Sequence, residues 1–302
     1  MPERTSYEHG TFSWVDLSTS DLEAAKTFYA GLLGWEYEVQ ETPMGPYVMA
    51  FKDGKAVAGM GNQPQEQKEM GIPSLWNSYV SVVSADETAA KAAELGGTVH
   101  VPPMDAMDAG RMAFIAAPGG EVFGVWEPKN HIGAGLVNEP GSLGWNELAT
   151  RDLDAAKSFY RGLFGWNIET GPNPSGVGEY TAISVGENMN GGMLVMDENG
   201  PAGIPACWSV YLYVADIEAA TQRRRTWAAA SSCRPWRSRT LAPWWSWKIR
   251  PAPCSLPWRW RLSPPSPRSP HSAPVAPGLQ SACCHESTPN HRSPPSPRAR
   301  QA

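Results

Sequence analysis

Residues 11–35 read TFSWVDLSTSDLEAAKTFYAGLLGW, and residues 142–166 read SLGWNELATRDLDAAKSFYRGLFGW. The two segments are identical at 14 of 25 positions at a constant offset of 131, so an internal repeat organises this part of the chain.

Each repeat begins with a strand pattern and continues with a helix pattern. Alternation of Phe12, Trp14 and Asp16 with their neighbours predicts a strand. Apolar residues then recur at helical spacing, and Gly34 ends the predicted helix. Ser20 and Glu23 have the spacing of a capping box, so we expect Ser20 to be the N-cap.

Short strands separated by turn residues follow each predicted helix, which defines a strand–helix–three-strand module. In the first module we expect them at 36–40, 47–53 and 56–61. A second module begins at Trp76 and has strands at 98–102, 111–117 and 121–127. A third module runs from about 142 to 196, and a fourth begins at Trp208.

Charge divides the chain into two unlike parts. Residues 1–222 contain 11 Lys and Arg against 29 Asp and Glu, a net charge of −18. Residues 223–302 contain 14 basic residues and one acid, a net charge of +13. The acidic part argues against general nucleic-acid binding. It contains one cysteine, so it has no disulfide framework. No membrane span or secretory signal is recognisable, and we expect a cytoplasmic protein.

The chain resembles the vicinal oxygen chelate superfamily of glyoxalases, bleomycin-resistance proteins and extradiol dioxygenases, and is most similar to its tandem, two-domain "hydroxylase" type from actinobacteria. The likeness covers roughly residues 8–222. It is carried by DLEAAKTFYAGLLGW, its repeat DLDAAKSFYRGLFGW, ELGG at 94–97 and APGGEVFGVWEP at 117–128.

The resemblance implies an α+β fold in which two modules per domain form a curved mixed sheet around a cup that holds a ligand or metal. Domain 1 is then residues 8–128, residues 129–141 are a linker, and residues 142–222 form an incomplete domain 2. We expect residues 223–302 to form a disordered Pro/Arg/Trp-rich tail.

In metal-using members, first and last strands of each module supply His, Gln or Glu ligands. The corresponding first-strand positions here are Trp14, Asn77, Trp145 and Ser209, and a last-strand position is Gly124. None is His, Glu or Asp, and His9, His100 and His131 lie elsewhere in the sequence. We therefore expect no cofactor; the alternative is a divalent metal, as in the metal-using members, for which the ligand positions are not matched.

Aromatic and polar residues remain on the predicted cup strands. They suit a planar ligand that is cationic or hydrogen-bonding. The candidate ligand-binding residues are Trp14, Asp16, Asn77, Tyr79, Trp126, Trp145 and Glu147. Five of them also have a structural interpretation: Trp14 and Trp145 as core residues, Asp16 and Glu147 as solvated strand residues or ion-pair partners, and Asn77 as a partner of backbone groups.

The tail looks like a frame-shifted continuation of the fourth module. A one-base shift permits AADLGGSIVVPPMEV where the first domain reads AAELGGTVHVPPMDA. This interpretation places a frameshift near codon 223. An incomplete second domain would expose a sheet edge, from which we expect self-association.

Three functions compete. The first is binding of a small organic molecule without metal, in resistance or detoxification. The second is catalysis as a glyoxalase-type lyase or an oxygenase, and no catalytic residue is identified for it. The third places function in the tail, whose charge suits nucleic acid and whose SPPSPRSP segment suits a partner protein.

Overall fold

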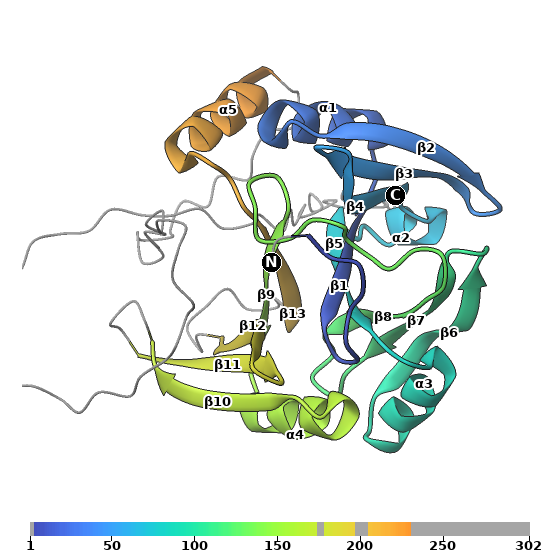
Figure 1. Ribbon diagram of the computed structural model, residues 1–302, viewed down its shortest axis with the longest axis vertical. Helices are drawn as coiled ribbons and strands as arrows, with labels where there is room; N and C mark the ends of the chain where they lie inside the picture. The colour runs from blue at the N-terminus through green and yellow to red at the C-terminus, as the bar shows by residue number, and fades with distance from the viewer. Residues whose placement is uncertain (1–2, 174–177, 197–204, 231–302) are drawn as a thin grey trace, which may run out of the picture.

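The computed structural model describes residues 3–173, 178–196 and 205–230, which form two curved sheets with helices packed on them (Figure 1). No helix in these ranges is long and apolar enough to cross a membrane. The expectations for residues 231–302 lie outside the described residues.

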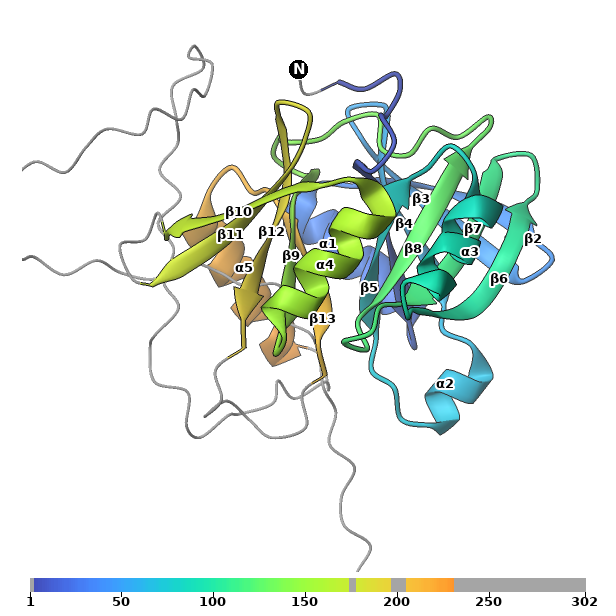
Figure 2. The same ribbon diagram turned by 90° about the horizontal axis from the view of Figure 1, so that it is seen from below.

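Domain 1 is an eight-stranded sheet built from two copies of the predicted module. Its strand order is β2-β3-β4-β1-β5-β8-β7-β6. The first module contains β1 (Phe12–Thr19), α1 (Leu22–Leu33), β2 (Glu36–Thr42), β3 (Gly45–Lys52) and β4 (Lys55–Asn62). The second contains β5 (Leu75–Ser81), α3 (Ala85–Glu94), β6 (Thr98–Ala106), β7 (Gly110–Ala116) and β8 (Val122–Pro128). A short helix, α2 (Gln65–Glu69), was not expected and stands apart from the sheets (Figure 2).

The two modules are related in their strand pairing. In each module the first strand runs parallel to the last: β1 pairs with β4, and β5 pairs with β8. The modules join where β1 pairs antiparallel with β5, which sets Asp16 opposite Asn77 and Trp14 opposite Tyr79. This junction is at the centre of the sheet, so it is where a shared site would form.

Domain 2 repeats one module and the first strand and helix of another. It contains β9 (Leu143–Thr150), α4 (Leu153–Phe164), β10 (Asn167–Pro172), β11 (Glu179–Val185), β12 (Asn188–Val195), β13 (Cys207–Leu212) and α5 (Ile217–Ala230). The order β10-β11-β12-β9-β13 matches the first five strands of domain 1. Helix α5 extends to Ala230, past residue 222, where we expected the tail to begin.

Helix ends confirm the repeat and correct one detail of it. Gly34 and Gly165 both follow their helices in the left-handed conformation, at φ of 72° and 70°. The N-cap of α1, however, is Asp21 and not Ser20: the Asp21 carboxylate accepts a hydrogen bond from the backbone N–H of Ala24 at 2.9 Å. Asp152 caps α4 in the same way. The expected Ser20 cap was therefore wrong by one residue.

One hydrophobic core is shared by the two domains. Phe12 of β1 contacts Trp166 and Trp208 of domain 2, at ring distances of 5.5 and 4.9 Å. Phe123 packs similarly against Tyr160 and Phe164 of α4. In Figure 1, α5 lies beside α1 and α4 beside α3, so helices of the two domains meet at both ends of the interface.

The segment from 129 to 141 lies against domain 1 through backbone hydrogen bonds. His131 N–H donates to the Ala109 carbonyl at 3.0 Å, Ala134 N–H to Ser13 at 2.7 Å and Gly135 N–H to Ala56 at 2.8 Å. The expected linker is thus an ordered covering of the sheet, which brings His131 close to the strands.

Candidate functional site

Asp16 is at the centre of the candidate site in domain 1. Strand alternation turns Trp14 and Asp16 to one face of β1 and Val15 and Leu17 to the other. The carboxyl group is half-buried, and its Oδ1 accepts a hydrogen bond from the Asn77 amide at 2.8 Å. The sequence-predicted pair is therefore in direct contact.

Two tyrosines complete the shell around this carboxyl group. The Tyr79 hydroxyl, from β5, donates to Asp16 Oδ2 at 2.8 Å, and the Tyr47 hydroxyl, from β3, donates at 3.3 Å. Trp14 Nε1 donates in turn to the Tyr47 oxygen at 3.0 Å. The Trp14 indole, the Tyr47 phenol and the Asp16 carboxyl group thus form a chain of hydrogen bonds, which the Tyr79 phenol and the Asn77 amide join at the carboxyl group. We call these five residues the Asp16 network.

Glycines make room for the tyrosine rings. A Cβ atom at Gly59 would lie 1.9 Å from the Tyr47 hydroxyl oxygen, and one at Gly124 would lie 2.3 Å from the Tyr79 ring. Gly59 is the partner of Asp16 on β4 and Gly124 the partner of Tyr79 on β8. Any side chain at these positions would displace a tyrosine from the carboxyl group.

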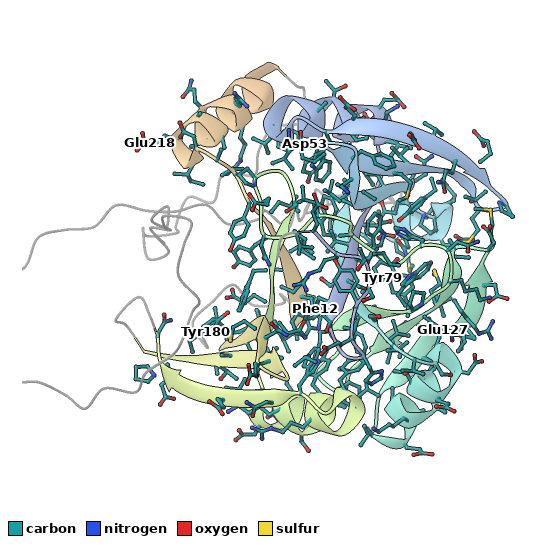
Figure 3. All side chains as sticks on the ribbon, viewed as in Figure 1. Phe12, Asp53, Tyr79, Glu127, Tyr180 and Glu218 are labelled. Atoms are coloured by element: carbon teal, nitrogen blue, oxygen red, sulfur yellow. The ribbon has the colours of Figure 1, made fainter. Side chains whose placement is uncertain are left out.

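Domain 2 contains the same arrangement around Glu147. Tyr180 donates to Glu147 Oε2 at 3.0 Å, Tyr211 donates to Oε1 at 2.8 Å, and Trp145 Nε1 donates to Tyr180 at 2.8 Å. A Cβ at Gly192 would lie 1.8 Å from the Tyr180 hydroxyl oxygen. We call Trp145, Glu147, Tyr180 and Tyr211 the Glu147 network. Figure 3 shows Tyr79 and Tyr180 on opposite sides of Phe12, one in each domain.

The two networks differ in one paired position. Asn77 is the strand partner of Asp16, whereas Ser209 is the partner of Glu147. The longer acid thus faces the shorter polar side chain. The two sites therefore share the tryptophan and tyrosine hydrogen bonds, and the Asn77 amide donor belongs to domain 1.

Burial dominates the ionisation of both acids. It raises the pKa of Asp16 above its usual value, and hydrogen bonds from Asn77, Tyr79 and Tyr47 oppose that rise. It likewise raises the pKa of Glu147, against the opposing hydrogen bonds of Tyr211 and Tyr180. In each site, phenol donors compensate a carboxyl group that the fold has removed from water.

Trp126 lies outside the hydrogen-bonded network and reaches Trp14 through His131. The His131 ring is 4.5 Å from the Trp14 ring and 5.8 Å from the Trp126 ring, and its carbonyl accepts from Trp126 Nε1 at 2.8 Å. His131 is not at a ligand position in the sequence, but the segment after β8 folds back onto the sheet and brings its ring to Trp14. Burial lowers the pKa of His131 to about 4, so it is neutral at pH 7.

The structure thus divides the seven candidate residues between two sites. Trp14, Asp16, Asn77 and Tyr79 meet in domain 1 with Trp126 nearby, and Trp145 and Glu147 meet in domain 2. Sequence reasoning missed Tyr47, Tyr180, Tyr211 and His131. The signal for Tyr211 was present, because Tyr79 and Tyr211 occupy equivalent positions in the two aligned strands.

Comparisons with known proteins agree with this architecture. The family model described as "Glyoxalase/Bleomycin resistance protein/Dioxygenase superfamily" matches residues 11–125. The chain is 41% identical over 226 residues to "Putative glyoxylase CFP32" of Mycobacterium tuberculosis, covering 72% of this chain and 83% of that protein. It is 31% identical over 232 residues to "Anthracycline biosynthesis protein DnrV" of Streptomyces peucetius, covering 72% and 82%.

A solved structure, a mutant of 4-hydroxymandelate synthase from Streptomyces coelicolor, has the same fold at a TM-score of 0.50 and 12% identity, covering 76% of each chain. This chain belongs to the glyoxalase/bleomycin resistance protein/dioxygenase superfamily.

The residues at the centre of domain 1 do not fit the divalent metal used in parts of this superfamily. Asp16 is surrounded by an amide and two phenols, and the last strands place glycines without a side-chain ligand beside them, Gly59 opposite Asp16 and Gly124 opposite Tyr79. The described residues contain no group of three or more His, Cys, Asp or Glu that could hold a metal ion. The donor set around Asp16 is suited to hydrogen bonding to an organic group.

Proposed function

We propose that this protein binds a small, planar organic molecule with a basic or hydrogen-bond-donating group at Asp16, without a metal, and acts in the cytoplasm in resistance or detoxification. The observation that carries this proposal is the Asp16 network: a half-buried carboxyl group held by two phenols and an amide.

The surroundings of the carboxyl group support an aromatic ligand. Tyr79 packs against Phe114 at a ring distance of 5.4 Å, and Phe114, Tyr47 and Met112 are each half-buried. Partly exposed rings beside a half-buried acid favour a flat ligand that stacks and presents a positive charge. The net charge of −18 in residues 1–222 favours capture of cations.

Two relatives are named for anthracycline biosynthesis, which makes an anthracycline with a free amine a suitable first probe. We expect the unmodified full chain to bind this amine, and the Asp16→Asn variant to bind it at least tenfold more weakly in calorimetric titration. For the N-acetylated form, which lacks the positive charge, the affinities of the wild type and the Asp16→Asn variant should differ much less.

The matched control is Glu147→Gln, which makes the same chemical change in domain 2 and leaves Asp16 in place. Equal amine affinity in the wild type and Asp16→Asn would contradict the proposal. A stoichiometric divalent ion after purification in metal-free buffer would contradict its metal-free part.

Turnover is a second candidate, favoured by the word "glyoxylase" in the name of the 41% identical relative. Its test is consumption of methylglyoxal with a thiol by the purified chain, with and without added divalent metal. Activity that requires metal would favour catalysis over sequestration.

Self-association through domain 2 stays a prediction, as does partner binding by the tail.

A further inference from the structure

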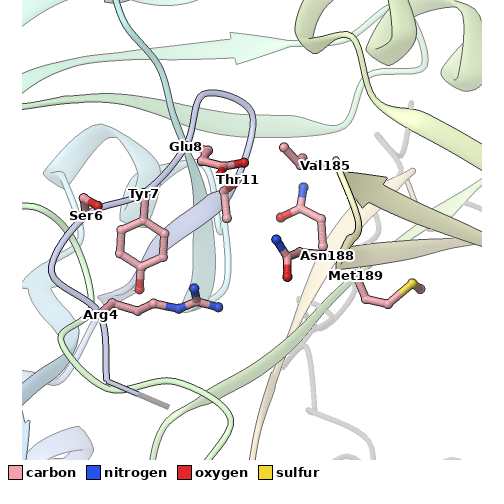
Figure 4. Close-up of a pocket in the computed structure, with 9 residues that line it drawn as sticks. Arg4, Ser6, Tyr7, Glu8, Thr11, Val185, Asn188 and Met189 are labelled. Carbon is pink, nitrogen blue, oxygen red and sulfur yellow. The ribbon is translucent and has the colours of Figure 1, made fainter. Parts of the chain in front are cut away.

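A pocket lies between the N-terminal segment and the β11–β12 turn of domain 2, away from both networks (Figure 4). It has a volume of about 190 Å³ and is lined on one side by Arg4, Ser6, Tyr7, Glu8 and Thr11, and on the other by Val185, Asn188, Met189 and Asn190. Ligand pockets for drug-sized molecules are about 300–1,000 Å³, so this one suits a molecule of a few heavy atoms.

The N-terminal wall of the pocket is fixed in place by the segment that covers domain 1. Arg4 N–H donates to the Gly135 carbonyl at 3.0 Å, and the Tyr7 hydroxyl donates to the Ala134 carbonyl at 2.7 Å. The Arg4 guanidinium lies over the Tyr7 ring, 5.9 Å from its centroid. The backbone of Arg4 is therefore anchored and its guanidinium has a ring contact, while the ion pairs among the described residues do not include Arg4.

Arg4 also has a donor that the protein does not use. Its Nε is buried, and no described residue accepts a hydrogen bond from it. Figure 4 shows the guanidinium extending toward Asn188 across the pocket. A buried donor without an acceptor is costly, and an oxygen ligand in the pocket would satisfy it.

The opposite wall is positioned just as firmly. The Asn190 side chain accepts from Phe12 N–H at 2.9 Å and donates to the Gly10 carbonyl at 2.9 Å, which ties β12 to the start of β1. Asn188 is exposed on the same turn, with its amide on the pocket. A molecule bound here would contact both domains.

We propose that this pocket binds a small monocarboxylate through the Arg4 guanidinium, with the amide of Asn188 and the hydroxyl of Thr11 as further partners. The planar fork of arginine matches a carboxylate through two parallel hydrogen bonds. Glu8 also lines the pocket, and its carboxylate repels a dianion more strongly than a monoanion, which favours a monocarboxylate over phosphate or a dicarboxylate.

The test uses the full chain with sodium acetate and sodium glycolate, compared with sodium chloride at the same ionic strength. We expect the organic anions to raise the midpoint of thermal unfolding and to give a saturable calorimetric signal. Arg4→Gln should remove both effects. Lys68→Gln, which makes the same charge change on α2, should keep them, as should Asp16→Asn, which separates this pocket from the Asp16 network.

Asn188→Asp covers the case in which Arg4→Gln fails to fold, because the Asn188 side chain is exposed and makes no hydrogen bond within the described part of the chain. Its added negative charge should weaken acetate binding at least tenfold. The proposal is overturned if acetate acts no differently from chloride, or if either folded variant binds acetate as the wild type does.

Discussion

At the scale of single residues, the position of one tyrosine depends on one glycine. Tyr47 reaches Asp16 only because Gly59 has no side chain, and Gly192 gives Tyr180 the same freedom in domain 2. The two networks therefore depend on backbone positions that carry no functional group themselves.

We expect Gly59→Ala to destabilise the protein by about 1–3 kcal/mol, because its Cβ would lie 1.9 Å from the Tyr47 hydroxyl oxygen. Gly61→Ala on the same strand is the control, since its nearest atom would be 3.7 Å away. Urea unfolding of both variants measures the difference. Equal stability of the Gly59→Ala and Gly61→Ala variants would mean that Tyr47 can move aside at little cost in free energy.

The hydroxyl of Tyr79 should hold down the pKa of Asp16. Tyr79→Phe removes that donor, so we expect the pKa of Asp16 to rise further, as read from the carboxyl carbon signal in an NMR titration. A raised folded-state pKa means that stability is lost as pH rises through it, so this variant should lose more stability than the wild type between pH 4 and 8. Tyr37→Phe is the control, because Tyr37 donates to a backbone carbonyl on α1. An unchanged Asp16 titration would contradict the assignment.

At the scale of elements, the start of α1 distinguishes two neighbouring residues. Asp21→Ala should cost about 1 kcal/mol, the usual value of a lost N-cap, while Ser20→Ala should cost less than about 0.5 kcal/mol. Chemical denaturation of the two variants decides between them. A larger loss of unfolding free energy for Ser20→Ala than for Asp21→Ala would favour the Ser20–Glu23 capping box that the sequence predicted.

The modules were predictable because their signals are local. Helical spacing, turn glycines and the repeated Trp-x-Asp and Trp-x-Glu pairs set the elements and the face on which Trp14, Asp16, Trp145 and Glu147 lie. Tyr47 and Tyr180 were harder to find because they are 133 residues apart, not 131, and each reaches its acid across an intervening strand. His131 depends on the return of a covering segment, which has no periodic signal.

At the scale of the whole molecule, a buried carboxyl group joins the domains. Glu121, at the turn before β8, is 1% exposed and accepts a hydrogen bond from Tyr160 of α4 at 3.2 Å, and Trp208 Nε1 donates to that tyrosine at 2.9 Å. Burial raises the pKa of Glu121. Its second oxygen has no partner among the described residues.

This arrangement predicts a pH-dependent domain interface. Because the folded-state pKa of Glu121 is raised, the protonated group favours the folded state at low pH, and that contribution is lost as pH rises through the raised value. Glu121→Gln keeps the shape of the side chain without its charge. The free energy of unfolding of the variant should therefore increase relative to that of the wild type as pH rises from 4 to 8. Glu127→Gln, on β8 itself, is the comparison. Parallel pH profiles for wild type and Glu121→Gln would contradict this role.

The shared core has an evolutionary consequence. Here Phe12 and Phe123 of one copy are packed against Tyr160, Trp166 and Trp208 of the other. Selection on either copy therefore acts on both, and the second would be retained for the sake of the first even if its own acid met no ligand.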